Sequence, residues 1–333
     1  MILLNIDYFL RFLLVSIAIS NARAYVEAGF YHSPENSTLT KVTEEESRQL
    51  GSICGRPTAT RKYPWAVSLS LHGFNKLGGV IISPYHILVQ LLQTVAHGFV
   101  RFNSAKPGPC NIINYKEFKT IAMKRVMFGS DCIHFARTPT TSIPTCKETN
   151  LKIRFIKAAV VDHSFAENTC IGGHDWAIIE VDKPIVFDES VSPICLPFKR
   201  RNNVRPILTA VSWGRSSFFN ESEAEMREIP MAYDPSCSAP WGDEMPTKND
   251  YLCAKSVDPS NYASKRTCHG DSGAGLHQTD QNGVSTLMGL TSFGSPGCPP
   301  NELARFTRIS EYIDNICEMT GVCYTSRKRK RRI

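Results

Sequence analysis

Residues 268–276 have the sequence Cys-His-Gly-Asp-Ser-Gly-Ala-Gly-Leu, and this stretch decides how the rest of the chain is interpreted. A reactive serine needs a sharp, exposed turn, which the glycines around Ser272 permit. The N–H groups of Gly270 and Ser272 can donate to an oxyanion that develops during a reaction. Turns of Gly, Ser and Asp are also common without any catalytic role, so the stretch alone does not exclude a structural turn. A catalytic serine needs a histidine as its base and an aspartate to orient that histidine.

Residues 1–24 have the pattern of a secretory signal peptide. The apolar run at residues 12–20 is too short to span a bilayer, and the Ala-Arg-Ala sequence at residues 22–24 fits the A-x-A cleavage pattern. No other run is long and apolar enough for a transmembrane helix. We therefore expect a secreted, extracellular protein with no membrane span.

The cysteine content supports this expectation, because all 12 cysteines lie beyond residue 24. A dense, even set of cysteines in a secreted chain predicts a framework of disulfides. Cys-x-x-Cys pairs are absent, so we expect no structural zinc, no other metal and no cofactor. Asn36 and Asn220 begin Asn-x-Ser/Thr sequons and are the candidate sites of N-glycosylation.

The formal net charge of +7 is concentrated at the ends of the chain. Residues 327–332, Arg-Lys-Arg-Lys-Arg-Arg, carry +6, whereas residues 25–326 carry no net charge. The body therefore lacks the positive excess of nucleic-acid-binding proteins, and we expect no nucleic-acid partner. We interpret residues 323–333 as a solvated basic tail that can attach weakly to acidic glycans.

The sequence pattern changes near residue 64. Residues 25–54 are polar and predict at most one short helix ending at Gly51, and we interpret residues 25–63 as a pro-segment or linker. Alternating apolar residues predict a half-buried strand over residues 65–71, and residues 78–82 predict a second strand.

Further strands are predicted at residues 177–181, 207–213 and 287–293. Apolar residues three and four positions apart predict a short final helix from residue 309, with Ser310 as its cap and Gly321 as its stop. Short strands separated by proline and glycine turns, with few helices, are typical of an all-β sandwich or barrel.

The candidate partners of Ser272 are His86, His97 and Asp175. An arbitrary histidine is more often a core or surface residue than a catalytic base. An acidic residue placed before a strand is usually solvated. Taken singly, these residues leave both interpretations open.

The predicted strands and sequence motifs, in this order along the chain, resemble those of the trypsin-like (chymotrypsin-fold) serine proteases. The resemblance covers residues 64–322 and is carried by motifs at residues 64–68, 78–83, 96–97, 175–179, 212–214, 251–254, 268–276, 292–294 and 297–298. The glutamate-rich segment ending in Cys54-Gly55 is also similar to divergent secreted members known mainly from nematodes. The resemblance implies two six-stranded antiparallel β-barrels with a C-terminal helix, a peptidase domain at residues 64–322, and a site between the barrels.

The resemblance also implies the role of each candidate residue. Ser272 would be the nucleophile, His97 the general base, and Asp175 the buried orienter of His97. Ser292 would help to hold Asp175, and Gly270 with Ser272 would form the oxyanion hole. The chain order His, Asp, Ser agrees with the chymotrypsin arrangement.

The implied activity is that of a secreted serine endopeptidase, which hydrolyses peptide bonds in proteins or peptides through an acyl-enzyme. The alternative is a catalytically silent homologue that binds proteins outside the cell. We prefer His97 to His86 as the base because His86 lies in the strand-end turn after Ser83 and Pro84.

Three disulfides follow from the resemblance, namely Cys54–Cys195, Cys237–Cys253 and Cys268–Cys298. The first of these would tether the pro-segment to the peptidase domain. The pairing of the other six cysteines stays open; they are Cys110, Cys132, Cys146, Cys170, Cys317 and Cys323.

The chain departs from the family pattern around the histidine. The bridge that normally clamps the histidine turn is missing, because its positions are Leu77 and Gly98. Residues 89–93 form an apparent insertion directly before that turn, and catalytic geometry tolerates little displacement. This insertion favours the silent alternative.

The activation signal of the family is missing too. Family members expose a new amino terminus whose amine pairs with the aspartate before the serine, and this pairing forms the oxyanion hole. No such Ile/Val-x-Gly-Gly motif occurs between Cys54 and Pro64. Asp271 therefore needs another cation, or the site stays inactive.

The expected substrate pocket has an unusual floor. The resemblance implies that it is lined by Arg266, Thr267, Ser292, Gly294 and Ala304, and trypsin-type members have an acidic residue where Arg266 lies. A buried cation there disfavours basic substrates, so we expect the pocket either to prefer an acidic residue before the scissile bond or to be partly closed. The alternative is that Arg266 points to solvent.

Overall fold

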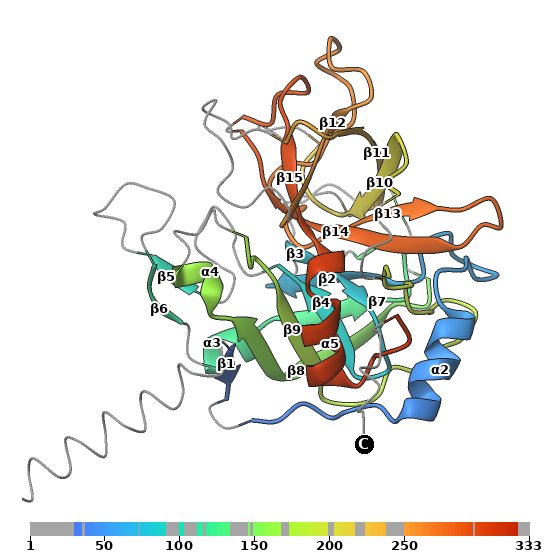
Figure 1. Cartoon of the computed structure of the whole chain (residues 1–333), viewed down its shortest axis with the longest axis vertical. Helices are drawn as coiled ribbons and strands as arrows, with labels where there is room; N and C mark the ends of the chain where they lie inside the picture. The colour runs from blue at the N-terminus through green and yellow to red at the C-terminus, as the bar shows by residue number, and fades with distance from the viewer. Residues whose placement is uncertain are drawn as a thin grey trace, which may run out of the picture.

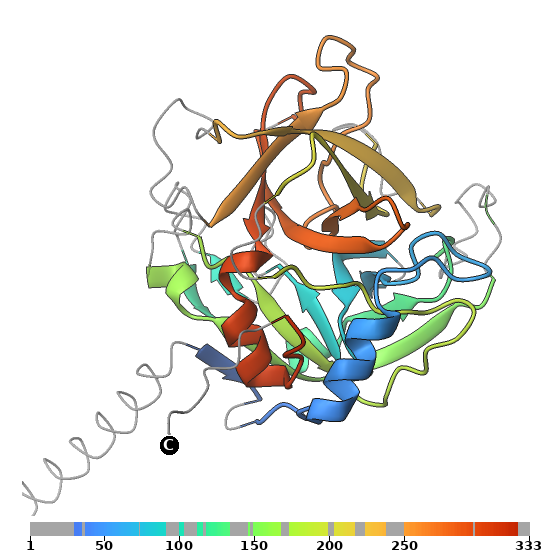
Figure 2. The same ribbon diagram turned by 45° about the vertical axis from the view of Figure 1, so that its right-hand side comes forward.

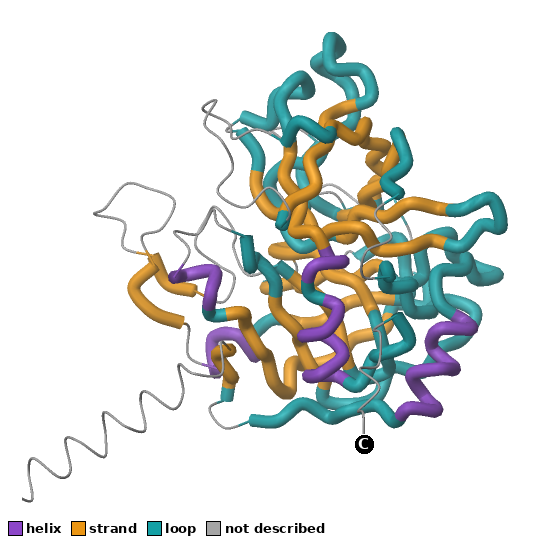
Figure 3. The backbone as a smooth tube through the Cα atoms, viewed as in Figure 1, coloured by secondary structure: helices purple, strands orange, loops and turns teal. Residues whose placement is uncertain are grey.

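The computed structural model shows a chain built mainly of short antiparallel strands (Figure 3). The residues that it describes are 30–34, 37–72, 74–90, 100–102, 112–115, 118–133, 146, 149–167, 173–198, 203–216, 224–237, 250–295 and 297–325.

Six strands of the first half form a closed barrel, because β8 pairs with both β7 and β9. In sheet order they are β8 (Lys152–Asp162), β7 (Arg125–Phe128), β2 (Ala66–Leu71), β3 (Phe74–Ile81), β4 (His86–Val89) and β9 (Ala177–Val181). A seventh strand, β1 (Phe30–Ser33), pairs with the end of β8. It lies in the segment for which the sequence predicted at most one helix.

Six strands of the second half form the other closed barrel. In sheet order they are β10 (Ile207–Ser212), β11 (Arg227–Asp234), β12 (Tyr251–Ser256), β15 (Ala304–Arg308), β14 (Ser285–Phe293) and β13 (Gly275–Thr279). Figures 1 and 2 show this barrel above the first. The prediction of two six-stranded antiparallel barrels with a C-terminal helix is confirmed.

The largest apolar cluster joins the two barrels to the final helix, α5 (Ile313–Thr320). It contains the fully buried side chains of Trp65 and Val80 from the first barrel, Trp213 and Leu290 from the second, and Ile316 from α5. Burial of such large apolar side chains is the main favourable contribution to folding. The barrels are therefore packed as one body, and residues at their junction are held from both sides.

Helix α2 (Glu44–Ile53) continues two residues past Gly51, where the sequence analysis placed its end. A Cβ at Gly51 would lie 3.0 Å from the ring of Tyr324, so this glycine allows close packing rather than ending the helix. At the other end, Thr43 and Glu46 form a reciprocal capping box. The expected linker thus carries a well-capped helix packed on the body.

The prediction for the last helix was right at its end and wrong at its start. Gly321 has a left-handed φ of 78° and stops α5 as expected. Ser310 does not cap it, because residues 309–311 form a 3-10 turn, η1 (Ile309–Glu311), and α5 begins at Ile313.

Two further corrections concern the first barrel. Strand β2 is buried on both faces, not on one, because Ser68 and Ser70 on its polar face are also covered. His86 does not lie in a turn but begins strand β4. Its imidazole is buried, with Nδ1 2.7 Å from the Oγ of Ser83.

The remaining elements are short and peripheral; they are strands β5 (Val100–Phe102) and β6 (Ile112–Tyr115) and helices α3 (Phe118–Ala122) and α4 (Ser164–Glu167). Within the described part of the chain, no helix has both the length and the apolar character needed to cross a membrane.

Candidate active site

Ser272 lies in the tight connection that leads into β13, with 9% of its surface exposed. Its carbonyl accepts a hydrogen bond of 2.7 Å from the N–H of Gly78 on β3, and the N–H of Gly273 donates to Thr291 on β14. Gly273 has a φ of 79°, and a Cβ there would lie 2.4 Å from the carbonyl oxygen of Gly78. The serine is therefore clamped between the barrels, in a conformation that requires the glycine after it.

Gly270, the expected oxyanion residue, is also connected to the first barrel. Its φ is 88°, and its carbonyl accepts a 2.8 Å hydrogen bond from the side-chain amide of Asn75. The hydroxyl of Ser68 in turn donates to Asn75 Oδ1 over 2.7 Å. Sequence reasoning missed Asn75 and Ser68 because polar residues that alternate with apolar ones suggest a solvated face.

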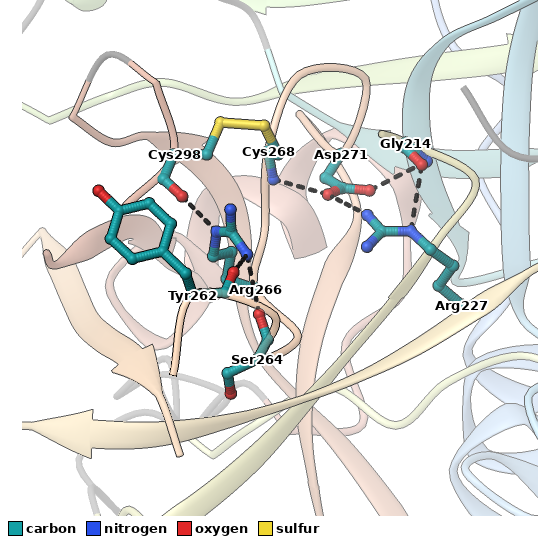
Figure 4. Close-up of a disulfide and its surroundings, with 8 residues drawn as sticks. All are labelled: Gly214, Arg227, Tyr262, Ser264, Arg266, Cys268, Asp271 and Cys298. Carbon is teal, nitrogen blue, oxygen red and sulfur yellow. Dashed lines mark hydrogen bonds and ion pairs between the residues drawn. A yellow bond between two sulfur atoms is a disulfide. The ribbon is translucent and has the colours of Figure 1, made fainter. Parts of the chain in front are cut away.

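Asp271 is fully buried, and its cation is Arg227 at the start of β11 (Figure 4). Arg227 Nη2 lies 2.8 Å from Asp271 Oδ2, and the backbone N–H groups of Cys268 and Gly214 donate to the same carboxylate over 2.7 and 3.0 Å. Burial raises the pKa of Asp271, and the charge of Arg227 opposes that rise. The sequence analysis left open whether Asp271 finds another cation or the site stays inactive, and it did not identify Arg227.

Asp175 lies between the barrels, also fully buried. Its Oδ2 accepts hydrogen bonds of 2.5 Å from the Ser292 hydroxyl and from the Gln90 side-chain amide. Thr307 on β15 donates to the backbone carbonyl of Asp175 over 2.8 Å. The structure thus brings Asp175 and Ser292 together and adds Gln90 to them.

The two neighbours of Asp175 hold it in place. His174 Nδ1 lies 2.7 Å from Asp162 Oδ2, and the indole N–H of Trp176 donates to the same oxygen over 2.8 Å. His174 adopts a left-handed φ of 63°, which is uncommon for a residue with a side chain. Asp162 at the end of β8 therefore anchors the short turn that presents Asp175.

Gln90 follows β4 directly, so the apparent insertion at residues 89–93 begins inside the barrel rather than in a surface loop. The Gln90 side chain is fully buried, and its amide N–H₂ also donates to the carbonyl of Ser292 over 2.9 Å. His97, the expected base, lies outside the described residues. An amide nitrogen cannot accept a proton in the way an imidazole can.

A cavity of about 280 Å³ opens beside Ser272, and all five residues expected at the substrate pocket line it. Its lining residues are Met231, Ser256, Arg266, Thr267, Cys268, His269, Ser272, Thr291, Ser292, Phe293, Gly294, Ser295, Cys298, Pro299, Glu302, Leu303 and Ala304. The disulfide Cys268–Cys298 joins two of its walls. The cavity can hold one side chain of a bound peptide.

Arg266 is held inside this region, with only 7% of its surface exposed. Its Nε donates to the carbonyl of Cys298, and its Nη1 donates to the carbonyls of Tyr262 and Ser264 over 2.9 and 3.0 Å (Figure 4). These acceptors are neutral, and Arg266 forms no ion pair with another described residue. The pocket region therefore keeps a positive charge, which disagrees with an Arg266 that points to solvent.

The described residues contain five disulfides: Cys54–Cys195, Cys132–Cys146, Cys237–Cys253, Cys268–Cys298 and Cys317–Cys323. The three pairs implied by the resemblance are among them. Cys268, His269 and Cys298 cluster closely, but disulfide sulfurs are not thiolates and cannot ligate a metal as thiolates do. Other expected features also lie outside the described residues, namely Cys110, Cys170, the sequon residues Asn36 and Asn220, and the basic run 327–332.

Comparison with known proteins gives one family and several relatives. A model of the Trypsin family matches residues 137–316, just over half of the chain. The chain is 25% identical to the proclotting enzyme of Tachypleus tridentatus over 309 residues, covering 86% of this chain and 73% of that protein. It is also 25% identical to Serine protease filzig of Drosophila melanogaster over 308 residues, covering 88% of this chain but only 16% of that protein.

Proposed function

Because the chain belongs to the trypsin family of serine proteases, we propose that it is a secreted endopeptidase whose nucleophile is Ser272. The observation that carries the proposal is the position of Ser272 on the wall of a cavity sized for one substrate side chain. A buried, ion-paired Asp271 directly before the serine supports it. Secretion is supported by the disulfides, which form in oxidising compartments, and by the signal-like residues 1–24.

The proposed reaction is acyl transfer. Ser272 Oγ attacks the carbonyl carbon of the scissile bond and gives its proton to a base, the role assigned to His97. The same base returns the proton to the leaving amine as the C–N bond breaks, and water then hydrolyses the acyl-enzyme. Asp175, held by Ser292, supplies the buried negative charge that orients the base.

The substrate preference follows from Arg266. A carboxylate on the residue before the scissile bond would meet a region of positive charge, whereas a lysine or arginine would be repelled. We therefore propose cleavage after aspartate or glutamate. The acidic side chain of Glu302 also lines the cavity, but its carboxylate is exposed and bonded to Ser295, so water screens it better.

A panel of peptides that differ only in the residue before the scissile bond tests the proposal. Peptides with Asp or Glu should be cut fastest, Arg266→Asp should shift the preference toward Lys and Arg, and Ser272→Ala should abolish all cleavage. Faster cleavage of Lys or Arg peptides by the unaltered protein would overturn the acidic preference. Cleavage that persists in Ser272→Ala would remove Ser272 from the nucleophile role.

Gln90 favours a second candidate function, a catalytically silent protein-binding homologue. Its side-chain N–H₂ donates a hydrogen bond to Asp175 Oδ2, the oxygen to which the Ser292 hydroxyl also donates. If that amide replaces the base, Ser272 stays protonated and unreactive. A folded protein that binds peptides in the cavity but cuts none would establish this second function.

A further inference from the structure

We propose that Arg227 is an internal counter-ion that holds the Ser272 loop in its working shape, so that the intact chain needs no activating cleavage. The positional part of this inference stands on the structure of the loop alone. Its catalytic consequence rests on the proposed function. Asp271 lies next to the proposed nucleophile, and its fully buried carboxylate carries a charge that the interior must balance.

The Arg227 guanidinium is bonded both to the Asp271 carboxylate and to the carbonyl of Gly214. Its Nη2 lies 2.8 Å from Asp271 Oδ2, and its Nε donates to the carbonyl of Gly214 over 3.1 Å. The Asp271 side chain is 0% exposed and that of Arg227 only 12%. A planar guanidinium with two anchored nitrogens fixes the position of the carboxylate better than a flexible ammonium does.

The carboxylate is also linked to the rest of the loop. The N–H of Cys268 donates to Asp271 Oδ2, and the N–H of Ala274 donates to the carbonyl of Asp271. Because Asp271 is bonded covalently to Gly270 and Ser272, a displacement of its backbone would also move both expected oxyanion donors. Among the described ion pairs, Arg227 is the cation of Asp271.

The segment that would supply an activating amine is fixed elsewhere. The N–H of Gly55 donates to the carbonyl of Pro193, and the carbonyl of Gly55 accepts from Ser285. Further along, the buried Arg61 pairs with Asp131 over 2.7 Å. A new terminus between residues 55 and 63 would have to leave these contacts and then compete with a cation already in place.

Loss of Arg227 leaves a buried carboxylate without its partner, which is strongly destabilising locally. In Arg227→Met we expect hydrogen exchange of the amides at 268–273 to rise ~10-fold or more, with α2 and α5 unchanged. Cleavage of an acidic peptide by Ser272 should fall by about 100-fold, because small displacements of catalytic groups are costly. Arg227→Lys should recover part of the rate, since lysine restores the positive charge but not the two bonded nitrogens of the guanidinium.

Two further variants separate the local charge from general damage to β11. Arg227→Met with Asp271→Asn removes both charges and should return the loop to near-normal exchange protection. Glu228→Gln removes the neighbouring charge on the same strand and should leave loop exchange as it is. Intact mass of the active protein should show no cut between residues 54 and 64.

The outcomes for the two proposals are distinct. Unchanged exchange at 268–273 and unchanged cleavage in Arg227→Met would overturn the counter-ion role, as would activity confined to a chain cut between residues 54 and 64. If the unaltered protein cuts no peptide but Arg227→Met still loosens the loop, the proposed activity fails while the positional role of Arg227 is supported.

Discussion

At the scale of single residues, Gly214 shows how closely the buried carboxylate is enclosed. A Cβ added there would lie 2.1 Å from Asp271 Oδ1 and 2.6 Å from the Asp271 backbone nitrogen. No side chain fits that space, because one of the contacts is to backbone. The glycine that follows Trp213 is therefore required by Asp271 rather than by its own backbone conformation.

Gly214→Ala should accordingly lower the free energy of unfolding by about 1–3 kcal/mol, as over-packing of a filled interior does. Urea denaturation measures the change. Gly294→Ala is the matched control, since a Cβ at that exposed glycine would make only an ordinary contact of 3.8 Å with Ala304. Equal stability of the two variants would contradict the close approach of Asp271.

The hydrogen bond from Gln90 to Asp175 makes a second prediction at this scale. Gln90→Ala removes a donor from a buried charge and should lower the free energy of unfolding by about 1–3 kcal/mol. Gln90→Glu should cost more at pH 7, because it places a second carboxylate beside Asp175, and the difference should shrink at pH 5 as that acid is protonated. Equal losses for the two variants at pH 7 would show that the side chain does not face Asp175.

The residues that sequence reasoning identified share one property, namely a motif with a fixed local spacing. Ser272, Asp175 and the five pocket residues were located in this way. Arg227 and Gln90 were missed because nothing local marks them. Arg227 reaches Asp271 only because the β10–β11 register sets it opposite Ser212.

At the scale of secondary-structure elements, helix α2 depends on its amino-terminal cap. Thr43 accepts from the Glu46 N–H over 3.2 Å, and the Glu46 carboxylate accepts from the Thr43 N–H over 2.6 Å. Hydrogen bonding of the Glu46 carboxylate to Thr43, first to its backbone N–H and then to its side chain, lowers the pKa of Glu46. The helix has three acidic residues in its first turn, which also suit the positive end of its dipole.

Thr43→Ala should therefore lower the free energy of unfolding by about 1 kcal/mol, measured by urea denaturation. Thr43→Ser keeps the hydroxyl and should keep most of the stability. If both variants matched the unaltered protein, the cap would contribute nothing to the folded body.

Element ends were the least predictable part of the fold. Alternating or continuous apolar residues in the sequence predicted strands β2, β9, β10 and β14. Strand β1 carried no such signal, because its pairing with β8 comes from the folded barrel. The start of α5 was missed because the apolar spacing of residues 309–312 also suits the 3-10 turn found there.

At the scale of the whole molecule, two fully buried histidines, one from each barrel, stay uncharged in the folded chain. His86 on β4 is buried beside the Ser83 hydroxyl, and His277 on β13 packs against the rings of Tyr63 and Trp65 at the junction. Burial lowers the pKa of each imidazole from 6.5 to about 4. Between these two pKa values the unfolded chain therefore binds a proton at each imidazole, whereas the folded chain does not.

The sign of this linkage predicts acid sensitivity. Stability is retained above pH 6.5 and falls between pH 6.5 and about 4, by about 1.4 kcal/mol per pH unit for each histidine. Urea denaturation at pH 7, 6 and 5 measures the slope, and His277→Gln should reduce it. His72→Gln, at an exposed histidine, is the control; a slope that His277→Gln leaves unchanged would contradict the burial of His277.

We infer that the uncut chain already holds an assembled site around Ser272. Labelling of the secreted, folded protein with a fluorophosphonate, followed by intact mass, tests it most directly. We predict one adduct on a chain with no cut between residues 54 and 64, and none in Ser272→Ala. No adduct before or after limited proteolysis, or an adduct only on the cut chain, would contradict the claim.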